Sequence, residues 1–170
     1  MPSNAERPLS DKVAIVTGSA RNIGRAICHA LADAGAAVVV NTRADTEGMD
    51  EVVNGIGTAG GKALGFQADV TREAEVTAMV QATRDAFGAV DILVHNAGLR
   101  RRCAFTELSL DEWHRVMGVN LDGAFLCARA CIGPMLAAGG GRIIALGGVS
   151  GHAGAAERAH VVASKAGLVG

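Results

Sequence analysis

The stretch from Lys12 to Ala26 limits the possible folds of this chain more than any other stretch does. Its residues are typical of a buried strand, a glycine turn and the start of a helix in one unbroken run. Val13–Val16 is continuously apolar, Gly18 and Gly24 punctuate the turn, and apolar residues at helical spacing follow. A helix N-terminus offers unpaired N–H groups and the positive end of the peptide dipole, and glycines let a phosphate approach the backbone without meeting a Cβ. The sequence therefore predicts a phosphate site in this turn.

The rest of the chain repeats the alternation of strand and helix, which is typical of a parallel sheet with helices on both faces. After a polar tail (1–10) we expect a single domain over 11–170. We predict strands at 13–16, 37–40, 63–67, 90–94 and 142–146, and helices at 23–34, 50–56, 73–87, 109–138 and 158–170. The expected fold class is α/β, a Rossmann-like doubly wound parallel sheet truncated after the fifth strand and the helix that follows it.

The composition argues against several kinds of partner. A formal net charge of −1 opposes general nucleic-acid binding, and no apolar run is long and uninterrupted enough to span a bilayer. The chain opens on a polar segment rather than a signal peptide, and its four cysteines include no C-x-x-C pair, so a cytoplasmic location is expected. Cys127 and Cys131 share a helix face without a histidine or carboxylate at matching spacing, which predicts core packing and no metal site.

Four motifs lie where strand ends and the long helix are expected. They are Thr17-Gly18-x-x-x-Asn22-x-Gly24, Asp69-Val70, Asn96-Ala97-Gly98 preceded by His95, and Asn120. In order and spacing they resemble the short-chain dehydrogenase/reductase family, from about Lys12 to Gly170, most closely the 3-oxoacyl-carrier-protein reductases. Asn22 stands where that family usually has glycine or alanine, and asparagine tolerates a left-handed backbone. The resemblance implies a dinucleotide site formed by Gly18, Ser19, Arg21, Asn22, Ile23, Gly24, Arg43, Asp69, Val70, Asn96, Ala97, Gly98 and Lys165.

The end of the second predicted strand bears on which cofactor is preferred. A NAD site usually places a carboxylate there to hold the ribose 2′-hydroxyl, whereas this chain has Thr42 followed by Arg43. Together with Arg21 in the first turn, Arg43 could clamp a 2′-phosphate, which favours NADP(H) over NAD(H). Both arginines could instead be ordinary solvated surface residues.

The resemblance fails at the residues that carry the chemistry. In the family, a Ser polarises the reacting carbonyl, a Tyr protonates it, and a Lys four residues after the Tyr lowers the pKa of the Tyr. Here Lys165 is present, but Val161 and Gly148 occupy the Tyr and Ser positions, and the chain contains no tyrosine. Neither replacement has a side-chain proton to donate.

Substitutes for the missing acid are His160, adjacent to the vacant position, and Ser150, two residues past Gly148. The candidate catalytic residues are thus Asn120, Lys165, His160 and Ser150. The first functional interpretation is an NADP(H)-dependent oxidoreductase acting on a small ketone or alcohol, with an altered acid. The second is a degenerate nucleotide-binding protein kept for binding or assembly.

Two further features concern partners. Arg100 to Arg102 follow the fourth strand near the expected mouth of the cleft, where they could steer an acidic or phosphate-bearing substrate or form a solvated charge run. The fifth strand would be an exposed apolar edge, so we expect either a fragment of a longer chain or a covering partner. In the family, the helices around Asn120 and Lys165 form dimer interfaces, which implies a homo-oligomer.

Overall fold

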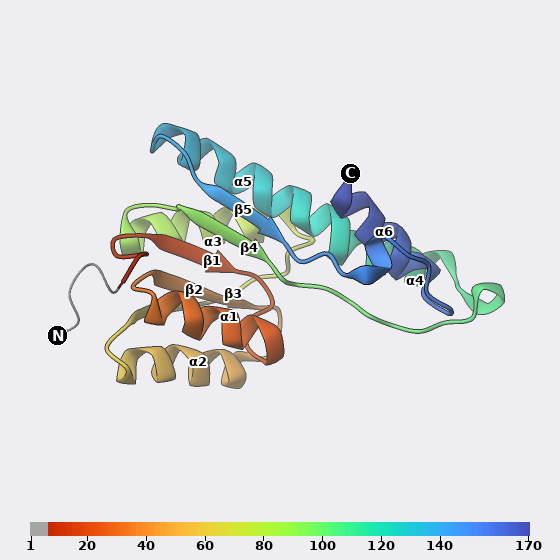
Figure 1. Cartoon of the computed structure of the whole chain (residues 1–170), viewed down its shortest axis with the longest axis horizontal. Helices are drawn as coiled ribbons and strands as arrows, with labels where there is room; N and C mark the ends of the chain where they lie inside the picture. Colours follow the sequence, from red (N-terminus) through yellow and green to blue (C-terminus); the bar gives the residue numbers. More distant parts are fainter. Residues whose placement is uncertain (1–6) are drawn as a thin grey trace.

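The computed structural model describes residues 7–170 and shows one five-stranded parallel sheet with the strand order β3-β2-β1-β4-β5 (Figure 1). The first six residues of the predicted tail lie outside the described part. Residues 7–10 form a turn in which the N–H of Leu9 donates to the Ala34 carbonyl. The strands are β1 (Val13–Val16), β2 (Ala37–Thr42), β3 (Lys62–Gln67), β4 (Ile92–His95) and β5 (Arg142–Ala145).

Helices cover both faces of the sheet, as the apolar strands require. The helices are α1 (Asn22–Asp33), α2 (Thr46–Thr58), α3 (Glu73–Phe87), α4 (Leu110–Met117), α5 (Gly123–Ala137) and α6 (Ala159–Val169). α1 and α2 pack on one face, where Cys28 and Val52 join the core, and α3 and α5 pack on the other with Met79 and Cys131. Figure 1 shows α4 and α6 beyond the carboxyl ends of the strands. The predicted α/β fold is confirmed.

Some boundaries differ from the sequence prediction. α2 runs over 46–58 rather than 50–56, because the Asp45 carboxylate accepts a hydrogen bond from the N–H of Gly48 and caps the helix one turn earlier. The glycines inside α2 lower its helix propensity, so the sequence pattern predicts a shorter helix than the structure has. β2 continues to Thr42 because it pairs with β3 up to Thr42 opposite Gln67.

The helix from Leu110 to Ala137 is continuous but changes its winding in the middle. Ser109 caps it by accepting a hydrogen bond from the N–H of Glu112. The Glu112 carboxylate lies near the guanidinium groups of Arg101 and Arg115, at 3.4 and 3.8 Å. Residues Gly118–Asp122 form a π-helical turn, a local widening that is frequent at functional sites.

The expectation that no apolar run is long enough to cross a bilayer is wrong for this helix. Its 28 residues contain a stretch with mean hydropathy 1.3, which passes a length-and-composition test for a membrane span. The sequence prediction missed it because the charged first turns obscure the apolar half. Cys127, Cys131 and Met135 pack against the sheet, which is the arrangement of a core helix in a folded domain.

The strand order reverses between β1 and β4, and in such sheets ligands bind outside the carboxyl ends of the strands at the reversal. At the far edge, β5 pairs only with β4 among the described strands, and Ile143 and Ile144 are exposed. The predicted exposed edge is therefore present.

Candidate functional site

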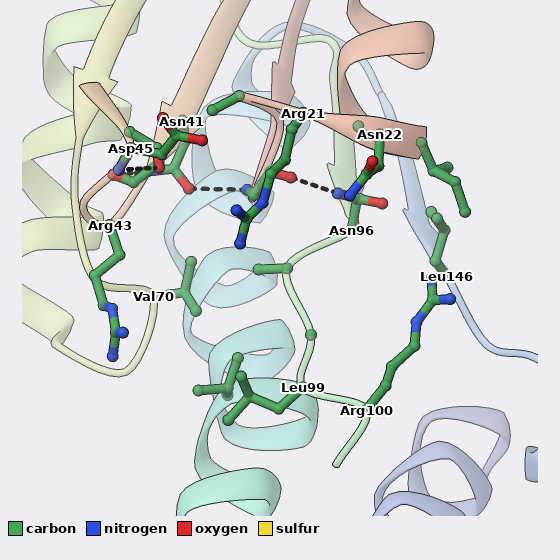
Figure 2. Close-up of a pocket in the computed structure, with 18 of the residues that line it drawn as sticks. Arg21, Asn22, Asn41, Arg43, Asp45, Val70, Asn96, Leu99, Arg100 and Leu146 are labelled. Carbon is green, nitrogen blue, oxygen red and sulfur yellow. Dashed lines mark hydrogen bonds between the residues drawn. The ribbon is translucent and has the colours of Figure 1, made fainter. Parts of the chain in front are cut away.

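A cavity of about 980 Å³ opens at the carboxyl ends of the strands, where the order reverses (Figure 2). Its size lies at the upper end of the range for small-molecule and cofactor pockets. Of the residues predicted to bind a cofactor, those that line it are Gly18, Arg21, Asn22, Ile23, Gly24, Arg43, Asp69, Val70, Asn96, Ala97, Gly98 and Lys165. The motifs that lie far apart in the sequence thus converge on one cavity.

The turn between β1 and α1 adopts a backbone conformation that its residue types tolerate. Gly18 and Asn22 have φ of 60° and 52°, in the left-handed region that glycine and asparagine tolerate. A Cβ added at Gly24 would lie 2.6 Å from both the Gly18 carbonyl oxygen and Asn96 Nδ2, so this position has no room for a side chain. The close approach of the helix start to the turn depends on this glycine.

Asn41, at the end of β2, holds the turn from one side and was not among the predicted site residues. Its buried Oδ1 accepts a hydrogen bond from the N–H of Gly18 at 3.2 Å, and its Nδ2 donates to the Phe66 and Ala68 carbonyls. Ser19 is buried and donates to the Val16 carbonyl, so it supports the turn without lining the cavity. An asparagine directly after three valines is the sequence signal for this role.

Thr17, at the end of β1, holds the turn from the other side. Its Oγ1 accepts hydrogen bonds from the N–H groups of Asn96 and Ala97 at 3.1 and 3.0 Å. In return, Asn96 Nδ2 donates to the Thr17 and Gly18 carbonyl oxygens at 3.0 and 2.7 Å. The glycine turn and the loop after β4 are therefore one hydrogen-bonded unit.

Arg43 and Asp69 stand together at the β2 side of the cavity. The Arg43 guanidinium is largely exposed and lies 4.0 Å from the Asp69 carboxylate. Partial burial tends to raise the pKa of Asp69, but hydrogen bonds from Thr71 and the charges of Arg43 and Arg72 outweigh it and hold that pKa below its usual value. Asp69 is therefore an ionised hydrogen-bond acceptor at neutral pH.

Lys165 enters the cavity from α6, on the same side of the sheet as the glycine turn. Its Nζ donates to the Leu146 carbonyl at the end of β5. Burial, together with the charge of Arg100, lowers the pKa of Lys165. Val161 and Gly148 line the cavity beside it, so at this end of the described lining Lys165 is the side chain that can release a proton, since arginine stays protonated.

Asn120 lies buried on the π-helical turn and fixes the position of α6. Its Oδ1 accepts from the N–H of Leu99 at 2.7 Å, and its Nδ2 donates to the Leu99 carbonyl and to Ser164 Oγ at 3.1 and 2.9 Å. A Cβ added at Gly98 would lie 3.3 Å from Asn120 Oδ1 and 3.9 Å from Lys165 Nζ. Asn120 thus stands next to the cavity wall, and Ser164, which precedes Lys165, is a supporting residue that sequence reasoning missed.

The two proposed substitutes for the missing acid are placed differently. His160 is fully buried, does not line the cavity, and has no hydrogen-bond partner on either ring nitrogen within the described residues. Its neighbour Val161 faces the cavity, because adjacent residues on an α-helix point about 100° apart. The backbone of Ser150 belongs to a short 3₁₀ turn, Val149–Gly151, but its side chain lies outside the described part.

His95, at the end of β4, is buried against Thr17. Thr17 Oγ1 already accepts two N–H groups, so its own proton is free to be donated to His95 Nδ1, 3.3 Å away. This requires a neutral ring. Burial, together with the charge of Lys165, lowers the pKa of His95 to about 4.

Replacing His95 by asparagine is expected to reduce the loss in the free energy of unfolding as the pH falls from 6.5 to 4. Between pH 6.5 and about 4 the unfolded chain binds a proton at His95 that the folded chain does not, so the stability conferred by the neutral ring is complete above pH 6.5 and falls as the pH decreases. By pH 4 the loss amounts to roughly 3 kcal/mol. Urea unfolding of both proteins from pH 7 to pH 4 measures it, and parallel profiles would contradict the assignment.

Comparison with known proteins agrees with this geometry. The family model for short chain dehydrogenases matches residues 12–170. The chain is 40% identical over 162 residues to a 3-oxoacyl-[acyl-carrier-protein] reductase of Synechocystis sp., covering 95% of this chain and 66% of that protein. It is 38% identical over 160 residues to a cis-4-hydroxycyclohexanecarboxylate dehydrogenase of Sinomonas cyclohexanicum, covering 94% and 64%.

A solved structure gives the same result. A protein from Sinorhizobium meliloti 1021 assigned as a short-chain alcohol dehydrogenase superposes with a TM-score of 0.92 at 35% identity, covering 96% of this chain and 65% of that one. The chain therefore spans about two thirds of the length of these relatives. With the glycine turn, the Asn96-Ala97-Gly98 loop and Lys165 in one cavity, the chain belongs to the short chain dehydrogenase family.

Proposed function

We propose that this chain binds NADP(H) in the cavity and acts as an oxidoreductase with an atypical catalytic site. The reaction interconverts a small ketone and its alcohol. The observation that carries the proposal is the convergence of the β1–α1 turn and Lys165 on one cavity. The family implies a nicotinamide cofactor, which supplies the hydride when bound. The Synechocystis and Sinomonas relatives are named for a reductase and a dehydrogenase, which supports this reaction class.

The residues present fit such a cofactor. The N-terminus of α1 suits a diphosphate, since the N-cap residue Arg21 makes no side-chain hydrogen bond to its amide groups and Gly24 presents no Cβ there. Asp69, ionised and at the cavity wall, suits the hydrogen-bond donors of an adenine ring. Figure 2 shows Arg43 at one side of the pocket with Arg21 nearer its middle, which supports a role for both in holding a 2′-phosphate.

The chain's own proton donor is the atypical part of the proposal. Reduction of a ketone builds negative charge on its oxygen, and a positioned cation or hydrogen-bond donor stabilises that charge. We assign this to the Lys165 ammonium, whose lowered pKa makes it a better acid, with Asn120 holding its surroundings in place. His160 and Ser150 remain the predicted alternatives, and the burial of His160 away from the cavity favours Lys165.

A second candidate function is nucleotide binding without turnover. The observation that favours it is the pair Val161 and Gly148, which line the cavity where the family carries its Tyr and Ser. The two functions share the cofactor site. An assay for turnover distinguishes them: the oxidoreductase oxidises bound NADPH when a panel of ketones is supplied, and the nucleotide-binding protein does not.

The cofactor preference is testable through one residue. Replacing Arg43 by aspartate is expected to weaken NADPH binding by about 10- to 100-fold and to leave NADH binding within about threefold, because a carboxylate repels a 2′-phosphate and accepts from a 2′-hydroxyl. Titration of cofactor fluorescence measures both. Arg84→Asp, the same charge change at an exposed position of α3 outside the cavity lining, is the control. No binding of either nucleotide at millimolar concentration would reject both candidate functions.

We also propose a cytoplasmic homo-oligomer, as expected for the family. Support for association comes from large apolar side chains that α5 leaves exposed: Phe125, Ile132 and Leu136. They are spaced seven and four residues apart, which puts them on one side of the helix, and exposed apolar side chains that gather on one face mark an interaction site more often than isolated ones do.

A further inference from the structure

We propose that Arg100 and Arg158 form a binding site for an anionic group, a carboxylate or a phosphate, carried by the carbonyl substrate. The site lies at the Lys165 end of the cavity, away from Arg43. The inference rests on the proposed function, since it names the class of substrate that the same cavity takes.

Arg100 comes from the loop after β4 and Arg158 is the residue before α6, and both line the cavity. Figure 2 shows the Arg100 side chain reaching toward Leu146, whose carbonyl accepts the hydrogen bond from Lys165 Nζ. Two segments far apart in the sequence therefore bring Arg100, Arg158 and Lys165 to the lining of one cavity.

Within residues 7–170, no carboxylate lies within 4.0 Å of Arg100 or Arg158. The carboxylates that line the cavity, Asp45 and Asp69, already cap α2 and accept from Thr71.

Arg101, next in the chain, shows the contrast, because it pairs with Glu112 and does not line the cavity. All three arginines of the run are exposed, and Arg100 is the one of the three that lines the cavity.

Lys165 is buried and Arg100 is exposed, and the positive charge of Arg100 adds to the effect of burial in lowering the pKa of Lys165, so the two like charges repel each other. An anion placed between them would replace this repulsion with charge-assisted hydrogen bonds, and arginine suits the planar geometry of a carboxylate or phosphate. The phosphates of the cofactor are assigned to the turn and to Arg43, so the anion here belongs to the substrate.

Val161 and Gly148 give no polar side chain to orient a carbonyl compound. A substrate with a neutral body would have little besides Lys165 to fix its position. An anionic arm held by Arg100 and Arg158 would supply the missing orientation, which is how fixed charge pairs raise the effective concentration of a reacting group.

The test compares matched pairs of carbonyl compounds with and without the charge. The probes are 4-oxopentanoate against its methyl ester, and dihydroxyacetone phosphate against dihydroxyacetone. Dissociation constants are measured by calorimetry or NMR titration, on the protein alone and on the protein with saturating NADPH. We expect the anionic member of at least one pair to bind at least tenfold more tightly, and the pair with the larger ratio identifies the anion.

Variants locate the effect. Arg100→Ala is expected to reduce the anionic preference to less than threefold, Arg100→Lys to retain part of it, and Arg102→Ala to leave it unchanged. Arg102→Ala removes the same charge from the same run at a residue that does not line the cavity. Circular dichroism confirms that each variant folds.

Two outcomes overturn the inference: equal binding of the charged and neutral member in both pairs, or an equal loss in Arg100→Ala and Arg102→Ala. Failure of the proposed function is a separate result, because it appears as absent NADPH binding. The ratio between charged and neutral probes is still measured on the nucleotide-free protein in that case.

Discussion

Gly24→Val is expected to abolish NADPH binding and to destabilise the domain by about 3 kcal/mol or more. A Cβ at this position would stand 2.6 Å from Asn96 Nδ2, from the Gly18 carbonyl oxygen and from Ser19 Cα. None of these atoms can yield, because two are backbone and Asn96 Nδ2 already donates to the Thr17 and Gly18 carbonyls. The turn must therefore open, and the amide groups that would face a diphosphate lose their arrangement.

Fluorescence titration with NADPH and urea unfolding measure the two effects of Gly24→Val. Gly57→Ala is the matched control, because a Cβ at Gly57 in α2 meets nothing within 4 Å. That variant should keep NADPH binding and gain up to about 1 kcal/mol from the better helix propensity of alanine. If Gly24→Val bound NADPH as tightly as the unaltered protein, the phosphate site would not be this turn.

Thr17→Val is expected to cost about 2 to 5 kcal/mol although valine has nearly the same shape. The change leaves the N–H groups of Asn96 and Ala97 without their acceptor, and each unsatisfied buried donor costs about 1 to 3 kcal/mol. It also removes the proton that Thr17 can donate to His95. The loop after β4 should then separate from the turn.

Urea unfolding gives the loss of stability, and hydrogen exchange at the amides of Asn96 and Ala97 should accelerate in Thr17→Val. Thr17→Ser keeps the hydroxyl and lacks only a methyl group, so its loss should stay near 1 kcal/mol. Equal losses in the two variants would mean that packing, and not the hydroxyl, holds the loop.

Much of the fold follows from local pattern. β1 is read correctly because four apolar residues precede a glycine turn, and α3 is read correctly because acidic residues open it and Gly88, with φ of 83°, ends it. The left-handed conformation at Asn22 is also as predicted. In each case the residues that decide the structure lie within one turn of the element they decide.

The missed features depend on residues far apart in the sequence. Asn41 and Ser164 support the site through hydrogen bonds to partners 23 and 44 positions away. The orientation of His160 depends on where α6 begins, and a shift of one residue would exchange it with Val161. The hydrophobic periodicity of the sequence alone does not determine which of these two adjacent residues faces the cavity. The same holds for the π-helical turn around Asn120, whose register depends on the loop after β4.

The central position of β1 has a consequence for the order of folding. Its neighbours in the sheet are β2 and β4, and the bonds that complete the glycine turn join Thr17 to Asn96, 79 residues later. Closing so large a loop is slow, since its entropy must be lost before any contact compensates for it. The glycine turn, although it precedes β2 and β4 in the chain, is therefore among the last parts to mature, and the proposed nucleotide site is complete only once nearly the whole sheet has assembled.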